Sequence, residues 1–175
     1  MMNCSKDKIS VYIDIDTAFT VFLENNQNLS YAKYLYIFRP KITNLDDVIA
    51  EICSLNPACL DTIVLDSVTS FYSLQGNSTI MNLNRKLGIY VSLLQMAVSR
   101  SNGRIIFTSM IRARKKNDDK SWYMFYAGGR LLRKRSDLIL ELKSKNKDLD
   151  ISILKSPDVS RTDTKLSLNG KYIEA

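Results

Sequence analysis

The stretch that decides the fold is Asp61–Ser70, which reads DTIVLDSVTS. Its first six residues form an apolar, β-branched run that is typical of a strand buried on both faces of a parallel sheet. The run ends in a carboxylate, Asp66, which is followed by small polar residues that favour a turn. A carboxylate at this position either belongs to a functional site or caps the turn that follows the strand.

The segments around this strand alternate between strand-like and helix-like patterns. We expect helices at Thr17–Asn25 and Leu45–Leu55, capped by Thr17 and Asn44, and a long helix at Leu83–Arg100 whose apolar residues recur at helical spacing. Further strands are expected at Lys8–Asp14, Lys33–Arg39 and Arg104–Met110. This alternation predicts an α/β fold with a largely parallel sheet flanked by helices on both faces.

The pattern changes after Met110. We expect Ile111–Tyr126 to be a long basic and aromatic loop, and a short helix to follow Gly128-Gly129. The later strands are closely spaced and joined by turns such as Asn169-Gly170, which is typical of antiparallel hairpins. They are expected at Asp137–Leu142, Asp150–Leu154, Lys165–Leu168 and Tyr172–Ile173. We therefore predict one domain, residues 1–175, with antiparallel strands at the C-terminal edge of the sheet.

Composition excludes several classes of protein. The chain has 175 residues, of which 45% are hydrophobic, so it can form a core, and it contains no apolar run long enough to span a membrane. Its polar N-terminal residues do not resemble a signal peptide, and we expect a cytoplasmic protein. The sequence has no histidine, which excludes histidine-dependent triads and histidine-ligated metal sites. Cys4, Cys53 and Cys59 are odd in number and unevenly spaced, so we expect no disulfide framework, with Cys53 and Cys59 packing as reduced apolar groups.

The net charge of +7 is concentrated in one segment. Between Ile111 and Arg135 there are nine basic and two acidic residues, so this window accounts for the whole excess. Such a concentration favours an anionic partner, with nucleic acid first and a membrane surface second, although a solvated surface loop explains a charge run equally well.

Four short motifs resemble the RecA/RadA recombinase superfamily, in particular its small archaeal RadA paralogues of the RadB and RadC type. YIDID at Tyr12–Asp16 is similar to the family's "YIDTE" strand end, and IVLDSVTS at Ile63–Ser70 to its Walker B strand. IIFTSM at Ile105–Met110 occupies the place of the family's "TNQ" strand. AGGR at Ala127–Arg130, with the later ILKSPD at Ile153–Asp158, resembles its closing segment. The resemblance covers nearly the whole chain and implies a RecA-like fold.

The chain departs from the family at the nucleotide site. Too few residues precede the first strand to form the family's phosphate-binding loop, so we expect a truncated paralogue without that loop. Asp16 stands where the family has a catalytic Glu, and Met110 where it has a Gln. Asp66 and Ser67 retain the Walker B positions. The resemblance thus implies a degenerate ATPase that is not an enzyme, has no catalytic residues, and uses no cofactor or metal.

The basic segment matches the place of a DNA-binding loop in this family. Basic residues could neutralise phosphates, and exposed aromatic rings could stack on unpaired bases. The expected DNA-binding residues are Arg112, Arg114, Lys115, Lys116, Lys120, Trp122, Tyr123, Arg130, Arg133, Lys134 and Arg135. The last four could instead reach the nucleotide of a neighbouring subunit. Phe71–Met81 matches the family's other DNA loop but has no positive charge. The expected partners are single-stranded DNA and a RadA-type recombinase, with self-association as a further option and no membrane.

Two alternatives remain open. Asp14 and Asp16 also fit the nucleophile and acid/base of a haloacid dehalogenase-like magnesium phosphatase, with Phe107-Thr108-Ser109 as its second motif. Against this, the acidic pair Asp118-Asp119 lies in a polar segment instead of following a hydrophobic strand. The other alternative is a subunit of a recombinase-paralogue complex that functions only through protein interaction.

Overall fold

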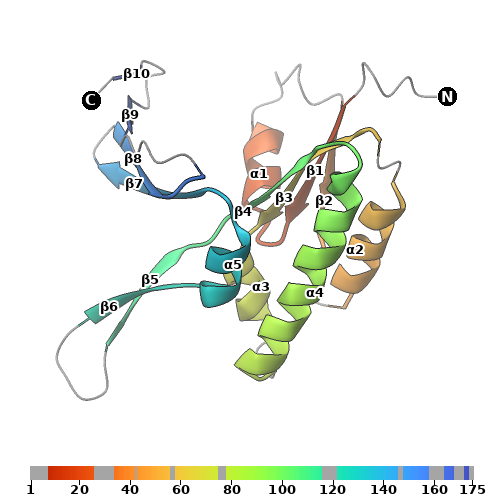
Figure 1. The fold of residues 1–175 in the computed structure, drawn as a ribbon, viewed down its shortest axis with the longest axis horizontal. Helices are drawn as coiled ribbons and strands as arrows, with labels where there is room; N and C mark the ends of the chain where they lie inside the picture. Colours follow the sequence, from red (N-terminus) through yellow and green to blue (C-terminus); the bar gives the residue numbers. More distant parts are fainter. Residues whose placement is uncertain are drawn as a thin grey trace. The chain divides into compact units, whose positions relative to one another are not determined.

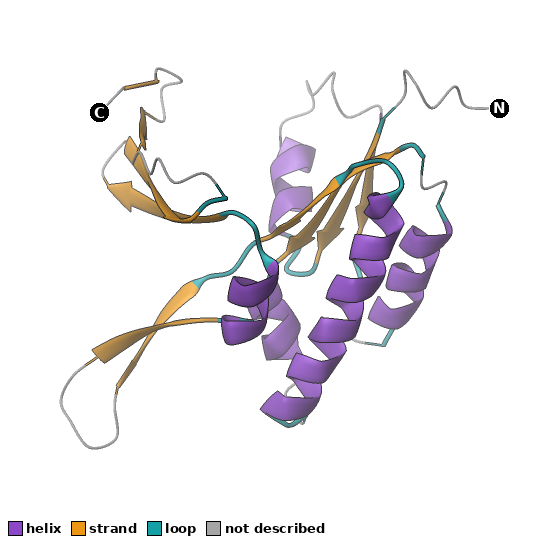
Figure 2. Ribbon diagram, in the orientation of Figure 1, coloured by secondary structure: helices purple, strands orange, loops and turns teal. Residues whose placement is uncertain are grey.

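The computed structural model describes residues 8–25, 34–41, 43–55, 58–74, 78–115, 122–145, 148–157, 164–167 and 172–173. The chain divides into two compact units, Met1–Gly129 and Arg130–Ala175. Figure 1 labels the helices and strands, and Figure 2 colours them by type.

The first unit is built on a four-stranded parallel sheet in the order β2-β1-β3-β4. Its strands are β1 (Ile9–Asp14), β2 (Leu35–Phe38), β3 (Leu60–Asp66) and β4 (Arg104–Phe107). The central strands β1 and β3 bury their apolar residues because helices cover the sheet. This arrangement confirms the predicted α/β fold with a largely parallel sheet.

Helices flank both faces of this sheet. The helices of the first unit are α1 (Ala18–Asn25), α2 (Leu45–Ser54), α3 (Val68–Leu74) and α4 (Ile80–Ser99). The connection from β1 to β2 crosses the sheet in one direction, whereas the connections from β2 to β3 and from β3 to β4 cross it in the other. Because such crossovers are right-handed, α1 lies on the face opposite α2 and α4. Figure 1 shows α2 and α4 side by side in front of the sheet and α1 behind it.

The core lies between the sheet and α2 with α4. Helix α4 buries the face that the periodicity predicted, and Thr79 caps its N-terminus by accepting a hydrogen bond from the Asn82 amide at 3.3 Å. The buried residues of α4 are Leu83, Leu87, Tyr90, Val91, Leu94, Ala97 and Val98. They pack toward Ile13, Ile63 and Leu65, which have no accessible surface. The helix begins three residues before its predicted start because Thr79 supplies this cap.

The segment after β4 is a β-hairpin, and the expectation of a loop there was wrong. Strand β5 (Ile111–Lys115) pairs antiparallel with β6 (Trp122–Tyr126), with Ile111 opposite Tyr126 and Lys115 opposite Trp122. The aromatic run of β6 has high strand propensity, and in β5 arginines alternate with smaller apolar residues. Strand pairing therefore organises a segment whose charge suggested an irregular loop.

The second unit contains helix α5 and an antiparallel sheet. Helix α5 spans Gly129–Arg135, and the sheet order is β10-β9-β8-β7. The strands are β7 (Ile139–Lys145), β8 (Asp148–Lys155), β9 (Thr164–Ser167) and β10 (Tyr172–Ile173). Antiparallel pairing is confirmed, but these strands pair with one another as a separate sheet and do not extend the parallel one. The Asn169-Gly170 turn lies outside the described residues.

Three local expectations were wrong. Residues Phe71–Leu74 are not a loop but belong to α3. This helix begins after Ser67, and the Ser67 side-chain oxygen caps it by accepting a hydrogen bond from the Ser70 amide at 3.1 Å. Asn44 precedes α2 but does not cap it, because its side-chain oxygen accepts from the Lys41 amide at 2.6 Å instead.

The third concerns the cysteines. Cys59 is disulfide-bonded and buried, whereas Cys53 is a free thiol. Cys53 is exposed on α2, so the expectation that it packs as an apolar group was wrong. Partial burial of its thiol raises its pKa, which keeps it protonated at neutral pH. Cys4 lies outside the described residues. The expectation that Cys59 is a reduced thiol was therefore wrong, because sequence spacing gives no distance between cysteines.

Candidate functional site

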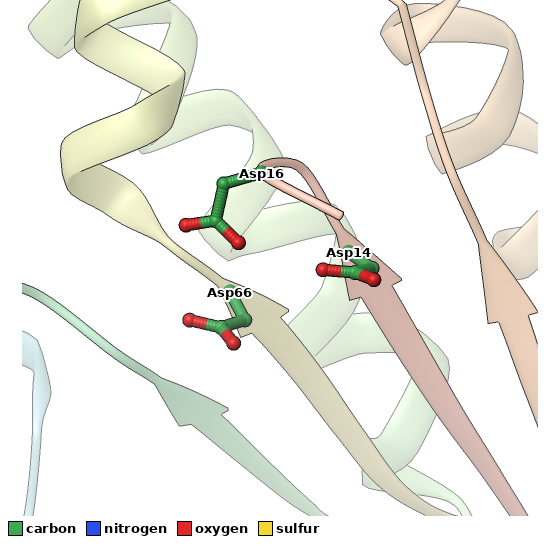
Figure 3. Close-up of side chains that lie close together, drawn as sticks. All are labelled: Asp14, Asp16 and Asp66. Carbon is green, nitrogen blue, oxygen red and sulfur yellow. The ribbon is translucent and has the colours of Figure 1, made fainter. Parts of the chain in front are cut away.

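Three carboxylates meet at one edge of the parallel sheet. Asp14 ends β1 and Asp66 ends β3, and the two residues lie directly opposite each other in the register of these strands. Asp16 follows two residues after Asp14. One oxygen from each of the three lies within 4.8 Å of the others, and Figure 3 shows the side chains converging. We call these three residues the acidic cluster.

The position of the acidic cluster follows from the strand order. The connection that leaves β1 runs to β2 on one side, whereas the connection that leaves β3 runs to β4 on the other. The carboxyl ends of β1 and β3 therefore flank the point where the winding of the sheet reverses. In open α/β sheets this is the place where ligands bind, because the two outgoing connections diverge there and leave a crevice.

Asp14 supports the start of helix α1 with one oxygen only. Its Oδ2 accepts hydrogen bonds from the Thr20 amide at 2.7 Å and the Thr20 hydroxyl at 2.6 Å. It therefore satisfies an amide of the first helical turn. The expectation that Thr17 caps α1 was wrong, because the Thr17 hydroxyl donates to the Asp16 carbonyl instead. The other oxygen, Oδ1, is buried and has no hydrogen-bond partner in the part of the chain that the structure describes, and the residue has no accessible surface.

The other two carboxylates accept hydrogen bonds from neutral groups. Asp66 accepts from the hydroxyls of Tyr12 and Thr108, and Asp16 accepts from the Ser70 hydroxyl at 2.9 Å. Among the described residues, none of the ion pairs involves the acidic cluster. Hydroxyl groups thus hold Asp16 and Asp66 in place, and no basic side chain among the described residues pairs with them.

The pKa of Tyr12 is affected by these carboxylates. Its pKa is raised above the ordinary tyrosine value, first by burial and then by its hydrogen bond to Asp66 and the charges of Asp66, Asp14 and Asp16. The phenol therefore stays protonated at neutral pH and remains a hydrogen-bond donor to Asp66. Its ring stacks on Phe19 of α1, with centroids 4.1 Å apart, which fixes its orientation.

The predicted Walker B residues lie together at this edge. Asp16 and Asp66 are in the acidic cluster, and Ser67 is buried, with its hydroxyl 2.8 Å from that of Ser70. The structure adds Asp14, which the Walker B resemblance did not assign. The sequence did show that two expected strands each end in an aspartate. It did not show that these strands are neighbours, so the approach of Asp14 to Asp66 was missed.

Hydrogen bonds connect this edge to the base of the hairpin. The Thr69 hydroxyl accepts from the Met110 amide at 2.9 Å and lies 3.4 Å from the Ser109 hydroxyl. Ser109 donates to the carbonyl of Ala127 at 3.3 Å. Residues just before β5 and just after β6 are therefore tied to each other and to α3.

The predicted DNA-binding residues are distributed over three places. In the hairpin, Arg112 lies opposite Phe125 and Arg114 opposite Tyr123, so basic and aromatic residues are cross-strand neighbours, as they also are at Lys115 and Trp122. Lys116 and Lys120 lie outside the described residues. Arg130, Arg133, Lys134 and Arg135 are exposed on α5, in the second unit. The structure thus places five of the expected residues on one hairpin and four on one helix.

The phosphatase alternative is not supported by this geometry. Its nucleophile would be Asp14, which has no accessible surface and uses one oxygen to hold the start of α1. A phosphate ester must reach its nucleophile directly. Asp14 is therefore better suited to holding a neighbouring group than to attacking a substrate.

Comparison with solved structures identifies the fold as a RecA-like α/β fold, with its parallel sheet flanked by helices. The crystal structure of the RadB recombinase is similar to this chain with a TM-score of 0.60 and 15% sequence identity, over 95% of this chain and 79% of that one. No family model and no curated protein matches the sequence. None of the described helices is both long and apolar enough to span a membrane.

Proposed function

We propose that this chain is a RecA-like recombination protein that binds single-stranded DNA through the β5–β6 hairpin. The observation that supports this most directly is the hairpin register, which pairs Arg112, Arg114 and Lys115 with aromatic residues across the two strands. Basic groups bind the phosphates of a single strand, and aromatic rings stack on its bases irrespective of sequence. The similarity to RadB is consistent with a role in recombinational DNA repair.

The proposed binding does not use ATP hydrolysis by this chain. Where the recombinases that the sequence resembles have a catalytic Glu and a Gln, this chain has Asp16 and Met110. Phosphoryl transfer depends on accurate positioning of the attacking water and of the charged groups, which a shorter acid and a thioether do not reproduce. The basic residues of α5 extend the DNA surface in this proposal, or act on the nucleotide of a RadA-type partner.

The test is fluorescence-anisotropy titration of labelled single-stranded DNA at several salt concentrations, without nucleotide. We expect affinity to fall steeply with salt, and the double variant Lys115→Glu/Lys116→Glu to bind more weakly. Loss of two phosphate contacts makes the log–log salt slope shallower by about 1.4, at about 0.7 per phosphate. The matched control is Lys41→Glu/Arg85→Glu, which changes the net charge equally at exposed positions away from the hairpin. Equal weakening by both double variants would contradict a specific role for the hairpin.

A second candidate function is an interaction-only subunit of a recombinase-paralogue complex. It is favoured by β4, which lies at one edge of the parallel sheet and leaves Ile106 46% exposed. An edge strand with exposed apolar side chains is suited to pairing with a strand of another chain. Light scattering coupled to size-exclusion chromatography discriminates between the candidates. A self-associated or partner-bound species with no DNA affinity at low salt would favour the second.

A further inference from the structure

We propose that Lys155 is a positioning residue for DNA binding by helix α5. In this proposal its ammonium group holds the end of α5 to the end of β8, and thereby fixes where the helix presents its basic side chains. The inference rests on the proposed function for the identity of the anionic ligand, which is single-stranded DNA. It goes beyond that function because Lys155 is not among the expected DNA-binding residues.

Helix α5 is too short and too highly charged to be ordered by its own sequence. It has seven residues, whereas an isolated helix of fewer than about 12 residues is only marginally stable in water. Arg130 and Lys134 are four positions apart, and like charges at this spacing destabilise a helix. Every residue of α5 lies in the described part of the chain, and none is buried, so the core does not fix the orientation of the helix. Contacts at the ends of α5 are therefore needed to hold it.

Lys155 provides such a contact at the C-terminal end. Its Nζ atom donates hydrogen bonds to the carbonyl of Arg133, at 3.2 Å, and to the carbonyl of Ser136. Arg133 belongs to the last turn of α5, and the Ser136 amide closes this turn by donating to the carbonyl of Leu132 at 2.8 Å. The last carbonyls of a helix have no partner within it and carry a partial negative charge, which makes an ammonium group a favourable partner. Lys155 thus completes the end of α5 from a different element.

The position of Lys155 in the sheet explains how one side chain can orient the helix. Lys155 is the last residue of β8 and lies opposite Ile139, the first residue of β7. Strand β7 begins four residues after α5 ends, so the hydrogen bonds of Lys155 bridge this short connection. All of these residues belong to the second unit. A change in the direction of α5 relative to β7 and β8 would therefore break both hydrogen bonds.

The surroundings of Lys155 favour positioning over direct contact with DNA. Lys155 is half-buried, and two of the three N–H donors of its ammonium group are used by the carbonyls of Arg133 and Ser136. In contrast, Arg130, Arg133 and Lys134 are exposed. Loss of one exposed basic residue removes one phosphate contact, whereas loss of Lys155 would misplace several at once. The two roles therefore differ in the number of phosphates that a single substitution affects.

The experiment measures that number by fluorescence anisotropy with labelled single-stranded DNA at several salt concentrations. Lys134→Met is the matched control, which should make the log–log salt slope shallower by about 0.7, the contribution of one phosphate. Lys155→Met should make the slope shallower by about 1.4 or more, because at least two phosphate contacts of α5 are lost. Lys155→Arg keeps a cation with several donors and should bind DNA as the wild type does.

Hydrogen exchange of the α5 amides, recorded without DNA, gives a second readout that does not depend on the ligand. Lys155→Met should speed exchange in α5 by about tenfold or more, because the end of the helix opens more readily. Lys134→Met should leave this exchange unchanged. Circular dichroism is recorded for every variant, and if Lys155→Met is unfolded, Lys155→Gln takes its place.

Several outcomes would overturn the proposal. Equal salt slopes for Lys155→Met and Lys134→Met would mean that Lys155 is one more phosphate contact. Unchanged exchange in α5 of Lys155→Met, or a DNA affinity that Lys155→Arg does not restore, would exclude positioning through the two carbonyls. Wild-type DNA binding that Lys155→Met leaves intact would overturn this inference alone. No DNA binding by the wild type would instead overturn the proposed function, and with it the role of Lys155, so the two failures are distinguishable.

Discussion

At the scale of single residues, Asp46 links the start of α2 to α4. It accepts hydrogen bonds from the Tyr90 hydroxyl and, at 2.9 Å, from the Lys86 ammonium group. These contacts, with Tyr90 first and Lys86 second, hold the pKa of the Asp46 carboxyl below its ordinary value. The interaction therefore favours the charged form of Asp46 in the folded state.

This pKa shift gives a prediction for acid stability. A carboxyl whose pKa is lower in the folded state stabilises the protein above its unfolded value of about 3.9, and this contribution is lost as the pH falls through the folded value. The urea midpoint of the wild type should therefore fall more between pH 6 and pH 3 than that of Asp46→Asn. The control Asp47→Asn should behave as the wild type does. Parallel pH profiles of the wild type and Asp46→Asn would contradict this role.

A second prediction at this scale concerns Ile13, a fully buried residue in the middle of the sheet. Ile13→Val removes one methylene from a close-packed environment and should lower the free energy of unfolding by about 0.5–1.5 kcal/mol. The same substitution at Ile89, which is 50% exposed on α4, should change it by less than about 0.5 kcal/mol. Urea unfolding of the two variants compares the sites directly, and equal losses would argue against this assignment of the core.

At the scale of elements, the turn between α4 and β4 depends on Gly103. A Cβ at this position would lie 2.7 Å from the backbone oxygens of both Leu60 and Asp61 at the start of β3. Asn102 adopts the left-handed conformation in this turn with φ of 53°, so Gly103 is needed for space and not for its φ. Gly103→Ala should destabilise the protein by about 1–3 kcal/mol, because backbone must move to admit the methyl group. Chemical denaturation should show a lower midpoint with an unchanged slope, and wild-type stability would refute the close approach.

The hairpin gives a prediction about aromatic stacking. Trp122 lies opposite Lys115 at the loop end of β5–β6, and in the proposed function its ring stacks on a base. Trp122→Ala should weaken binding of single-stranded DNA by about 1–3 kcal/mol, whereas the salt slope should stay the same because no phosphate contact is lost. Anisotropy titrations at two salt concentrations separate these quantities. A changed slope with unchanged affinity would exclude stacking.

Elements with a strong local signal were predictable from the sequence. The apolar residues of α4 recur at helical spacing, so both its type and its buried face could be predicted. Strands β1 and β3 are rich in apolar and β-branched residues, which indicated buried strands. Helix α3 was missed because seven residues are too few to establish a helical period, although Ser67 carried a capping signal. The acidic cluster could not be predicted, because it forms only when β1 and β3 are neighbours in the sheet, and strand order is set by tertiary structure.

At the scale of the whole molecule, burial is unevenly divided between the two units. All fully buried side chains of the described residues lie in the first unit, whereas the second exposes Leu138, Leu140 and Leu142. Stability follows apolar burial, so opening of the second unit should require less free energy than global unfolding. Native-state hydrogen exchange should show slower exchange in β1 and β3 than in β7 and β8. Equal protection in both sheets would mean that the two units unfold together.

Trp122, the only tryptophan in the chain, begins strand β6 of the hairpin. Excitation that selects indole over phenol therefore yields emission from this hairpin alone, without a mutation or an attached dye. Quenching by DNA, by iodide or by a partner protein can each be followed through this one intrinsic fluorophore. The unmodified chain can thus show, from its own emission, whether a change at α3 reaches the hairpin through the hydrogen bonds of Thr69 and Ser109.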